Sequence, residues 1–529
     1  MLPLQNRNKQ NSDFSEQNLT FDHNFNESNP MISSTASLEE SQSNCKYLCA
    51  NKIYDNLDVI LSDINNGSKI MIGGFGMCGV PENLIRGLLQ KHISNLHIIA
   101  GTGGSDDYGP GLLVKNKLAS AVDTTFIGSR ELNRQYFNGE IELNIVPQGD
   151  FTEKVRAARA GIPALFTSTG VDTILETGNV PVKYSLGGES VEKFSEIPEV
   201  KYFDGQKFLM IRSYKADFSL IKAWKADSKG NLVFRSTARN FNALMAGASK
   251  ITIAEVEEIV EDGELTPDMI HIPGIYVNRV IKGNYYEKRI GVLAVKTEND
   301  VEIFQDNLSQ ERLEKRLRIA KRAAKEIKPG MSVNLGLGIP TIASNYVDEK
   351  YGVLLHGENG VLGMSSFPSR DKIDPDSMNP SRQPITLSIG GSVFSSDMSF
   401  DIIRGGHIDV TMLGACQVSK HGDISNWIIP GKRAFGMGGA MELTKNCKKC
   451  IVCMEHIAGE SLKIMDECTL PLTGKNCVDM IITDLGVFEV NEENGLTLIE
   501  IAESVSLEFL RSQTACDFAV AEDLKLMQQ

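Results

Sequence analysis

The chain has 529 residues, 41% of them hydrophobic, and a formal net charge of −14. A chain of this length is expected to form two or more domains with sizeable hydrophobic cores. The acidic balance argues against nucleic acid as a main partner, because phosphate backbones are bound by basic surfaces. No uninterrupted apolar run approaches the roughly 18 residues of a membrane-spanning helix.

The segment 1–45 is rich in Asn, Gln and Ser, and this composition predicts a disordered tail. Arg7 and Lys9, with no acid among the first dozen residues, favour an organelle transit peptide, whereas Asp13 and Glu16 depart from the acid-poor pattern of such peptides. No secretory signal is present. The sequence therefore leaves both an organelle and the cytoplasm open as compartments.

From Tyr54 onward, short apolar strands alternate with amphipathic helical patterns, which is typical of α/β architecture. A strand is predicted over 69–72 and another over 96–100. Between them, a helix is predicted over 81–89, opened by Pro81 at a position that suits proline.

The chain also repeats itself. Residues 216–232 align without gaps with residues 408–424, so that Asp217 matches Asp409. We therefore predict two tandem, related, open α/β domains, at 46–283 and 311–529. The polar, charge-mixed stretch 284–310 is the predicted linker.

Ten cysteines in a chain of this length indicate free thiols in a reducing compartment. Cys447, Cys450 and Cys453 have a spacing that a metal site can use. The stretch 450–453 predicts a strand, however, in which a spacing of three places the two cysteines on opposite faces. No compact fourth ligand completes the set, although His456 is nearby. We predict no metal site.

Glu358 stands out because of its surroundings. The apolar run 353–355 predicts a buried strand, and it stops at the tight turn Gly357-Glu358-Asn359-Gly360. A carboxylate at the end of a parallel strand lies in the crevice where open α/β sheets bind ligands, and the glycines allow a substrate to approach closely. A solvated loop glutamate is the ordinary interpretation of such a residue. The first half has glycines at the matching place, so Glu358 would be a single reactive carboxylate in a paired cleft.

A glutamate nucleophile can attack an acyl carbon and divide a difficult transfer into two easier steps. It needs backbone N–H groups as an oxyanion hole, a dry pocket and binding energy from a remote part of the substrate. Candidate donors are Gly390 and Gly391, which follow a strand predicted over 385–389, and the glycines of 436–439. No dinucleotide or phosphate-loop fingerprint and no Gly-x-Ser-x-Gly elbow occurs, and no histidine lies near Cys78 to activate its thiol.

The sequence resembles the family I coenzyme A transferases that use succinyl-CoA and 3-oxo acids, and the resemblance covers about residues 47–529. Residues 66–81 match the first signature of the family, and residues 355–363 match the second with one departure. Bacterial members often carry the two halves as separate subunits, which agrees with the repeat. Further similar stretches lie at 238–242, 273–276, 334–340, 426–431, 436–440 and 469–475.

The resemblance implies a ping-pong transfer of CoA from succinyl-CoA to acetoacetate, with Glu358 as the nucleophile. An acyl-glutamyl anhydride and a Glu358–CoA thioester would be the intermediates. Gly439 would donate to the oxyanion, and Asn334 and Gln148 would line the acyl pocket. Gly390, Gly391 and Gly438 are predicted to bind CoA, which is a substrate, so no separate cofactor is expected.

The family also suggests a homodimer, the mitochondrial matrix and a role in ketone-body breakdown. Two departures bear on the substrates: Gly357 stands where the family usually has serine, and Gly101-Thr102 stands where it usually has two asparagines. A transferase for acetate, butyrate or another short acid is therefore an alternative. A CoA-dependent hydrolase and a catalytically silent CoA-binding protein are further ones.

Overall fold

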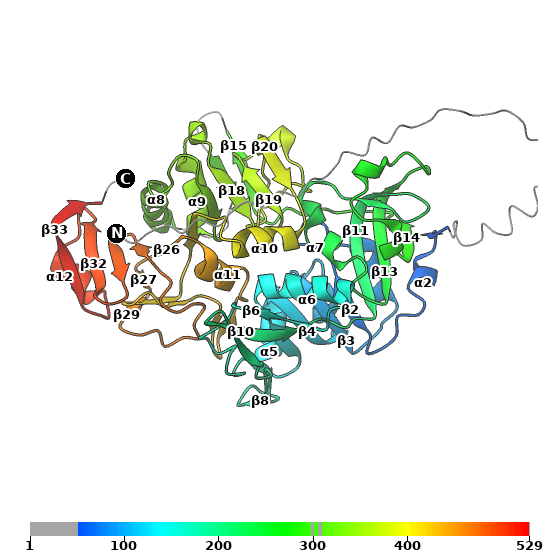
Figure 1. Cartoon of the computed structure of the whole chain (residues 1–529), viewed down its shortest axis with the longest axis horizontal. Coiled ribbons are helices and arrows are strands. Elements are labelled where there is room, and N and C mark those ends of the chain that lie inside the picture. Colours follow the sequence, from blue (N-terminus) through cyan, green and yellow to red (C-terminus); the bar gives the residue numbers. More distant parts are fainter. Residues whose placement is uncertain (1–50, 298–300, 305–308, 528–529) are drawn as a thin grey trace, which may run out of the picture. The chain divides into compact units, whose positions relative to one another are not determined.

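Two extended β-sheets carry the fold of this protein, for which a computed structural model describes residues 51–297, 301–304 and 309–527. The predicted tail at 1–45 lies outside the described residues. The first sheet has nine strands and the second has ten, and they follow one another along the chain (Figure 1). The prediction of a tandem α/β architecture is confirmed.

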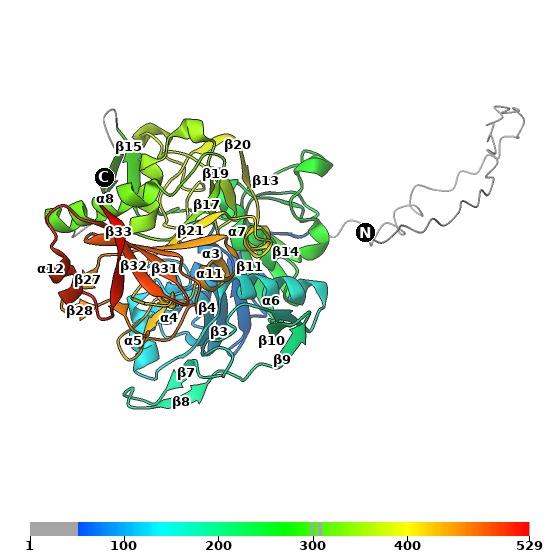
Figure 2. The same ribbon diagram turned by 60° about the vertical axis from the view of Figure 1, so that its left-hand side comes forward.

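Eight strands of the first sheet run parallel, in the order β1-β14-β13-β11-β2-β3-β4-β5, and β12 pairs antiparallel with β11. Figure 2 shows the consecutive strands β3 and β4 beside each other near the helices α3, α4 and α5. The strands are β1 (Ile53–Tyr54), β2 (Lys69–Ile72), β3 (Leu96–Thr102), β4 (Ala119–Phe126), β5 (Glu142–Ile145), β11 (Phe218–Ala226), β12 (Leu232–Val233), β13 (Ile251–Ile259) and β14 (Arg279–Lys282).

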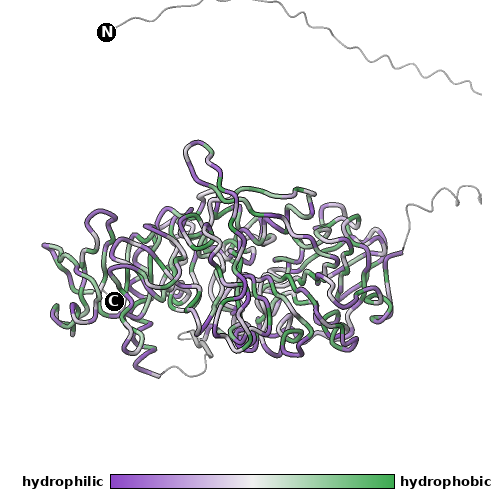
Figure 3. Tube along the Cα trace, turned by 90° about the horizontal axis from the view of Figure 1, so that it is seen from below, coloured by the Kyte–Doolittle hydropathy of each residue, from purple (hydrophilic) through white to green (hydrophobic). Residues whose placement is uncertain are grey.

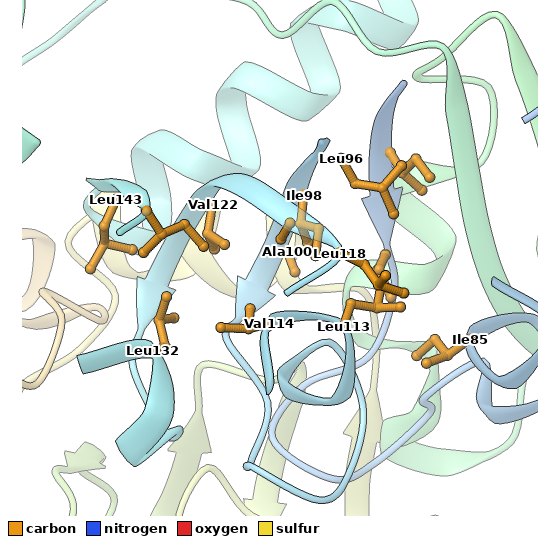
Figure 4. Close-up of a cluster of buried hydrophobic side chains, with 14 of the residues drawn as sticks. Ile85, Leu96, Ile98, Ala100, Leu113, Val114, Leu118, Val122, Leu132 and Leu143 are labelled. Atoms are coloured by element: carbon orange, nitrogen blue, oxygen red, sulfur yellow. The ribbon is translucent and has the colours of Figure 1, made fainter. Parts of the chain in front are cut away.

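Both faces of this sheet are covered, as expected for parallel strands. Alternate residues of β2 illustrate this, because Ile70 and Ile72 pack into one core and Met71 packs into the other. Figure 4 shows part of the first core, to which the strands and the helices α3, α4 and α5 contribute aliphatic side chains. The helices of this half are α2 (Leu57–Ile60), α3 (Glu82–Gln90), α4 (Gly111–Lys115), α5 (Arg130–Phe137), α6 (Gln148–Ala160) and α7 (Asn240–Met245).

The second sheet has the order β20-β19-β18-β17-β21-β26-β30-β31-β32-β33. Its middle strands from β18 to β30 are parallel, whereas β19, β20 and β31 pair antiparallel with their neighbours. The strands are β17 (Ser332–Leu335), β18 (Leu354–Gly357), β19 (Val361–Met364), β20 (Leu387–Val393), β21 (Val410–Leu413), β26 (Lys449–Cys453), β30 (Met480–Ile482), β31 (Gly486–Asn491), β32 (Gly495–Ile501) and β33 (Phe518–Leu526).

Helices cover both faces of the second sheet as well, since residues of α8 and α9 join one core cluster and residues of α10 and α11 join another. Cys450 lies in the second of these clusters and Cys453 in the first, so the prediction that they occupy opposite faces of one strand is confirmed. The helices are α8 (Gln310–Ala324), α9 (Ile339–Ala343), α10 (Ser396–Arg404), α11 (Ala440–Asn446) and α12 (Leu507–Ser512).

The sequence repeat is also a structural repeat. The order β14-β13-β11-β2-β3-β4 in the first sheet corresponds to β30-β26-β21-β17-β18-β19 in the second. The aligned aspartates make the same contacts, because Asp217 accepts a hydrogen bond from the N–H of Lys69 and Asp409 accepts one from the N–H of Ser332. Each aspartate is also paired with a lysine, at 2.8 Å to Lys250 and 2.6 Å to Lys448 respectively.

Several small sheets complete the described chain. The predicted linker 284–310 contains an antiparallel hairpin of β15 and β16, and its exact bounds stay a prediction. The remaining strands are β6 (Ala164–Thr167), β7 (Pro181–Tyr184), β8 (Val191–Phe194), β9 (Val200–Phe203), β10 (Gln206–Arg212), β15 (Leu293–Lys296), β16 (Val301–Phe304), β22 (Gln417–Ser419), β23 (Ile424–Ser425), β24 (Ile428–Ile429), β25 (Arg433–Ala434), β27 (Ile457–Ala458), β28 (Ser461–Leu462) and β29 (Ile464–Met465).

The two halves share a core. Trp427, Met437 and Met441 of the second half belong to the same buried cluster as the strands of the first sheet. Along the described chain, hydrophobic stretches alternate with hydrophilic ones (Figure 3). None of its helices combines the length and apolar character needed to cross a membrane.

Candidate active site

Glu358 lies in the tight turn that joins β18 to β19. The two strands are antiparallel, with Gly357 opposite Val361. The N–H of Gly360 donates to the carbonyl of Gly357 at 3.0 Å and closes the turn. Gly360 has a φ of +97°, and a Cβ atom there would lie 2.0 Å from the carbonyl oxygen of Phe394. The glycine that closes the turn after Glu358 is therefore required by both conformation and space.

This turn marks a topological difference between the two halves. In the first half, β3 is followed by the helix α4 and then by the parallel strand β4. In the second half, β18 returns at once as the antiparallel strand β19. The crossover of the first half is thus replaced by a hairpin, whose turn presents Glu358 beside the carboxyl end of the parallel strand β17. The predicted asymmetry of the paired halves is a difference in strand connection.

The strand before Glu358 is less buried than predicted. Leu354 is 40% exposed and Val353 and Leu355 are half-buried, whereas His356 and Gly357 are buried. The prediction of a buried apolar strand was wrong for these first residues, and burial of β18 begins only at His356, where Ser399 of α10 packs against the strand.

The carboxyl group of Glu358 lies in a poorly hydrated position. The residue keeps some exposure to solvent, yet burial raises the pKa of its carboxyl to about 7. No ion pair of Glu358 occurs among the residues that the structure describes. A buried carboxylate without a compensating cation is costly as an anion, and such groups cluster at functional sites.

Gly439 brings main-chain atoms against this carboxyl. A Cβ atom on Gly439 would lie 3.1 Å from Oε1 of Glu358 and 3.1 Å from the ring of Phe400. Gly439 immediately precedes α11, and its N–H donates no hydrogen bond within the described parts of the chain. The structure thus places a residue with an unused backbone N–H next to Glu358, and such groups can build an oxyanion hole.

Gly438 has a different role from its neighbour. Its N–H donates to the carbonyl of Thr125 at 2.9 Å, and its carbonyl accepts from the N–H of Gln148 at 2.8 Å. Both partners belong to the first half. The backbone groups of Gly438 therefore hold the two halves together. Both its N–H and its carbonyl are already hydrogen-bonded within the protein.

Gln148 is the first residue of α6 and is buried. Its backbone N–H is bonded to Gly438, but its side-chain Nε2 has no partner among the described residues. A buried amide group without a partner is unusual in a folded protein. It brings an unused hydrogen-bond donor from the first half to the backbone segment that contacts Glu358.

Asn334 lies near the end of β17, in register with His356. It is buried, and its Nδ2 donates to Nδ1 of His356 at 3.2 Å, whereas its Oδ1 has no partner in the part of the chain that is described. His356 in turn contacts Ser399 of α10 at 2.9 Å. Asn334 is thus paired with the segment before Glu358, and its part in an acyl pocket stays a prediction. The contact of Ser399 with this segment was not found from the sequence. Ser399 lies 42 residues after Gly357, to which it is bonded, and no motif links them.

Gly390 and Gly391 lie inside β20, not after a strand that ends at 389 as predicted. β20 pairs with β19, and a Cβ atom on Gly391 would contact backbone atoms of Ser388, Leu362 and Gly363. Glycine thus permits a close strand–strand approach here. The space beside Gly390 is open, and its predicted contact with CoA stays a prediction.

A buried charge cluster lies behind Gln148 and Gly439. Arg404 of α10 contacts Asp150 of α6 at 2.8 Å and Glu442 of α11 at 3.8 Å. Oε1 of Glu442 also accepts from the N–H of Asp150 at 3.1 Å. Burial raises the pKa of both carboxyls, and the charge of Asp150 raises that of Glu442 further. The cluster fixes α6 against α10 and α11 next to the residues that surround Glu358.

Gly101-Thr102 stands where the family usually has two asparagines, and packing explains the glycine. A Cβ atom on Gly101 would lie 2.1 Å from the ring of Phe241, so no larger residue fits without rearrangement. Thr102 is buried at the end of β3. At Gly357, a Cβ atom would lie 2.8 Å from Oδ1 of Asn359, which has no partner among the described residues.

A cavity of about 440 Å³ lies elsewhere, in the first half beside α6, and its lining includes His97, Asp123 and Lys154 but neither Glu358 nor Gly439. The described residues contain no group of three His, Cys, Asp or Glu side chains that could hold a metal ion. Glu358 is the candidate reactive group, because its poorly hydrated carboxyl lies against Gly439.

Comparison with known proteins identifies the family. The model of the coenzyme A transferase family matches residues 54–283 and 316–512. The chain belongs to the coenzyme A transferase family. The first matched segment covers the strands of the first sheet from Tyr54 onward, and the second covers those of the second sheet except β33. This match confirms the resemblance seen in the sequence.

Individual relatives agree with this assignment. The chain is 47% identical over 481 residues to the mitochondrial succinyl-CoA:3-ketoacid coenzyme A transferase 2A of Rattus norvegicus, covering 90% of this chain and 91% of that one. It is 43% identical to a single subunit of the succinyl-CoA:3-ketoacid coenzyme A transferase of Helicobacter pylori, over 45% of this chain and 96% of that subunit. The fold is similar to that of an acyl-CoA transferase from E. coli O157:H7, with a TM-score of 0.73 at 22% identity, over 90% of this chain and 95% of that one.

Proposed function

We propose that this coenzyme A transferase moves CoA from succinyl-CoA to a 3-oxo acid such as acetoacetate, with Glu358 as the nucleophile. The observation that carries the proposal is the position of Glu358. Its carboxyl has a pKa raised to about 7 by burial and lies against Gly439, whose N–H has no acceptor among the described residues. The relatives named after this reaction support the substrate pair.

The proposed chemistry begins with the ionised carboxyl of Glu358. One carboxylate oxygen attacks the thioester carbon, and the carbon–sulfur bond breaks. The CoA thiolate departs, and an acyl-glutamyl anhydride is formed. The thiolate then attacks the glutamyl carbonyl, which releases succinate and forms a Glu358–CoA thioester. The carboxylate of acetoacetate attacks this thioester and displaces the CoA thiolate, which gives an acetoacetyl-glutamyl anhydride. The thiolate then attacks the acetoacetyl carbonyl, so that acetoacetyl-CoA forms and the carboxylate of Glu358 is released.

The surrounding residues support these steps. The N–H of Gly439 would donate to the oxygen on which negative charge develops at each attack. The free amide groups of Gln148 and Asn334 would bind the acyl acid, since both side chains are buried and each has one polar atom without a partner among the described residues. Limited hydration around Glu358 would protect the anhydride from water. No further cofactor is required, because CoA itself is a substrate.

The proposal is tested by trapping the covalent intermediate. Wild-type protein incubated with acetoacetyl-CoA and then reduced with borohydride should lose activity, with Glu358 converted to the alcohol of its side chain. Glu358→Ala should abolish exchange and escape modification while remaining folded. Exchange by Glu358→Ala, or reduction at another residue, would refute the assignment of the nucleophile.

A matched glycine pair tests the role of Gly439. We expect Gly439→Ala to lower kcat by about tenfold to a hundredfold, because a misplacement of about 1 Å at a reacting group has an effect of that size. Gly414→Ala should have no effect, since no atom lies within 4 Å of the Cβ position there. Equal rates for the two variants would contradict the proposed oxyanion contact.

A transferase for acetate, butyrate or another short acid is a second candidate, because Gly357 and Gly101-Thr102 differ from the residues usual in the family. Rates of the wild-type protein with a panel of acceptor acids decide between the two. Net loss of thioester without any acceptor would instead indicate a hydrolase, and CoA binding without exchange would indicate a silent binding protein.

We also propose that the protein is a homodimer of the mitochondrial matrix. The dimer rests on the family resemblance. The compartment is supported by relatives whose names include the word mitochondrial. Light scattering on the purified protein and localisation of a C-terminally tagged full-length chain test the two statements, and a monomer or a cytoplasmic signal would overturn them.

A further inference from the structure

A chain of buried hydrogen bonds runs from Asn334 to the turn that carries Glu358. Nδ2 of Asn334 lies 3.2 Å from Nδ1 of His356, and Nε2 of His356 lies 2.9 Å from Oγ of Ser399. The hydroxyl of Ser399 donates to the carbonyl of Gly357 at 3.0 Å. Asn334, His356 and Ser399 are at most 1% exposed. Every link of this chain is therefore shielded from competing water.

The geometry fixes the direction of each hydrogen bond. The amide of Asn334 must present nitrogen to His356, because the same Nδ2 lies 3.5 Å from the carbonyl oxygen of His356, where an amide oxygen would be repelled. Nδ1 of His356 is then an acceptor. Burial lowers the pKa of His356 to about 4, so the neutral ring carries its single hydrogen on Nε2 and donates it to Ser399. The hydroxyl of Ser399 can then donate only to Gly357.

The chain of hydrogen bonds ends at the carbonyl of Gly357, directly before Glu358. The carbonyl of Gly357 accepts two hydrogen bonds, from the N–H of Gly360 within the turn and from Ser399 of α10. The second bond ties the turn to a helix that is itself held in place, since Arg404 of α10 is paired with Asp150 of the first half. The hydrogen bond to Ser399 thus fixes the position of the Glu358 backbone relative to α10.

We propose that His356 and Ser399 are positioning residues: the Nε2–H tautomer of His356 directs the hydroxyl of Ser399 to the Gly357 carbonyl and thereby fixes the backbone from which Glu358 attacks. The same tautomer turns the amide of Asn334 so that its Oδ1 is left without a partner among the described residues. One imidazole ring therefore sets both the placement of Glu358 and the orientation of the neighbouring amide. This inference rests on the proposed role of Glu358.

The kinetic test uses serine variants of one helix. Ser399→Ala should lower kcat for CoA exchange by about tenfold to a hundredfold with KM for the CoA thioester nearly unchanged, since the effect is on the alignment of the attacking group. Ser399→Thr keeps the hydroxyl and should restore most of kcat. Ser396→Ala is the matched control, because Ser396 is also a buried serine of α10 but its Oγ has no hydrogen-bond partner among the described residues. Full activity of Ser399→Ala, or failure of threonine to restore it, would overturn the proposal.

Two variants of His356 distinguish its hydrogen bond to Ser399 from its hydrogen bond to Asn334. His356→Gln can still donate to Ser399 through its terminal amide, whereas His356→Asn can accept from Asn334 but is too short to reach Ser399. We expect the glutamine variant to retain more of kcat than the asparagine variant. The opposite order would show that the link to Asn334 dominates and would contradict the role given to Ser399.

A spectroscopic test does not depend on activity. In wild-type protein labelled with ¹⁵N-histidine, the His356 signal, assigned by its absence in His356→Gln, should show hydrogen on Nε2 and none on Nδ1 from pH 5.5 to pH 8. A hydrogen on Nδ1, or a titration in this range, would refute the inference even if exchange is observed. If the wild-type protein exchanges no CoA but the tautomer is as stated, the proposed function fails and the hydrogen-bond chain stands as a structural feature only.

Discussion

Replacing Glu358 with glutamine should make the protein more stable at alkaline pH. Burial raises the pKa of the Glu358 carboxyl from an ordinary value of 4.5 to about 7, so the folded protein binds this proton more tightly than the unfolded chain does. The stabilising effect of that proton is complete below pH 4.5 and is lost as the pH rises through 7. Glutamine has nearly the same shape and carries no charge, so the variant does not lose this contribution.

The size of the effect follows from the change in proton affinity. A pKa of about 7 instead of 4.5 corresponds to about 3.5 kcal/mol at most, because each tenfold change in proton affinity is about 1.4 kcal/mol. Most of this develops between pH 5 and pH 8. We therefore expect the free energy of unfolding of Glu358→Gln, relative to wild type, to increase by about 2–3 kcal/mol between these pH values.

Urea unfolding of both proteins at pH 5 and pH 8 provides the measurement. Glu131→Gln is a suitable control, since the pKa of Glu131 is lowered to about 2 by its hydrogen bonds to Arg134, and its ionisation does not change over this range. The pH profile of kcat/KM supplies a second measurement. In the proposed mechanism only the ionised carboxyl attacks, so the rate should rise with an apparent pKa near 7. If the stability of Glu358→Gln relative to wild type is the same at both pH values, the carboxyl is well hydrated and our account of its reactivity is wrong.

Four further substitutions, at three positions, test the packing around Glu358. Gly439→Ala should remain folded, since its φ of −88° suits alanine, and should slow formation of the trapped Glu358 intermediate. Gly357→Ala should be destabilised by about 1–3 kcal/mol through overpacking. Gly357→Ser should be about 1 kcal/mol more stable than Gly357→Ala if its hydroxyl bonds to Oδ1 of Asn359, and a less stable serine variant would exclude this bond. Arg404→Gln should lower thermal stability by about 3–5 kcal/mol, more at pH 8 than at pH 5, because it leaves buried carboxylates without their cation; equal melting temperatures for wild type and variant would contradict this.

Local sequence predicted much of the fold. The strand 69–72 was predicted with its observed bounds, and the helix predicted over 81–89 is α3, at Glu82–Gln90. Such elements are set by short-range patterns of apolar residues and by proline and glycine, which act within a few residues. The gapless match of 216–232 with 408–424 predicted the structural repeat, since similar sequences form similar secondary-structure elements.

Glycine patterns were less informative where strands pair. The strand predicted to stop before Gly390 instead runs through Gly390 and Gly391, and β19 approaches so closely at Gly391 that a side chain there would contact its backbone. The apolar run at 353–355 predicted a buried strand, and this was wrong, because burial depends on whether another element covers the strand. Both errors arise from neighbours that are distant in the sequence.

Local patterns were enough to predict that one carboxylate, Glu358, would stand in a glycine turn at the end of a strand, at a place where the two halves differ. They were also enough to predict the family. That the difference is a hairpin in place of a crossover, and that Gly439 lies against Glu358 while Gly438 holds Gln148, became visible only in the folded chain. Backbone placement, burial and hydrogen-bond direction depend on residues brought together from both halves, and no local pattern records these contacts. Ser399 is the clearest case, because a serine in a helix carries no local sign that its hydroxyl donates to the carbonyl of Gly357, directly before Glu358.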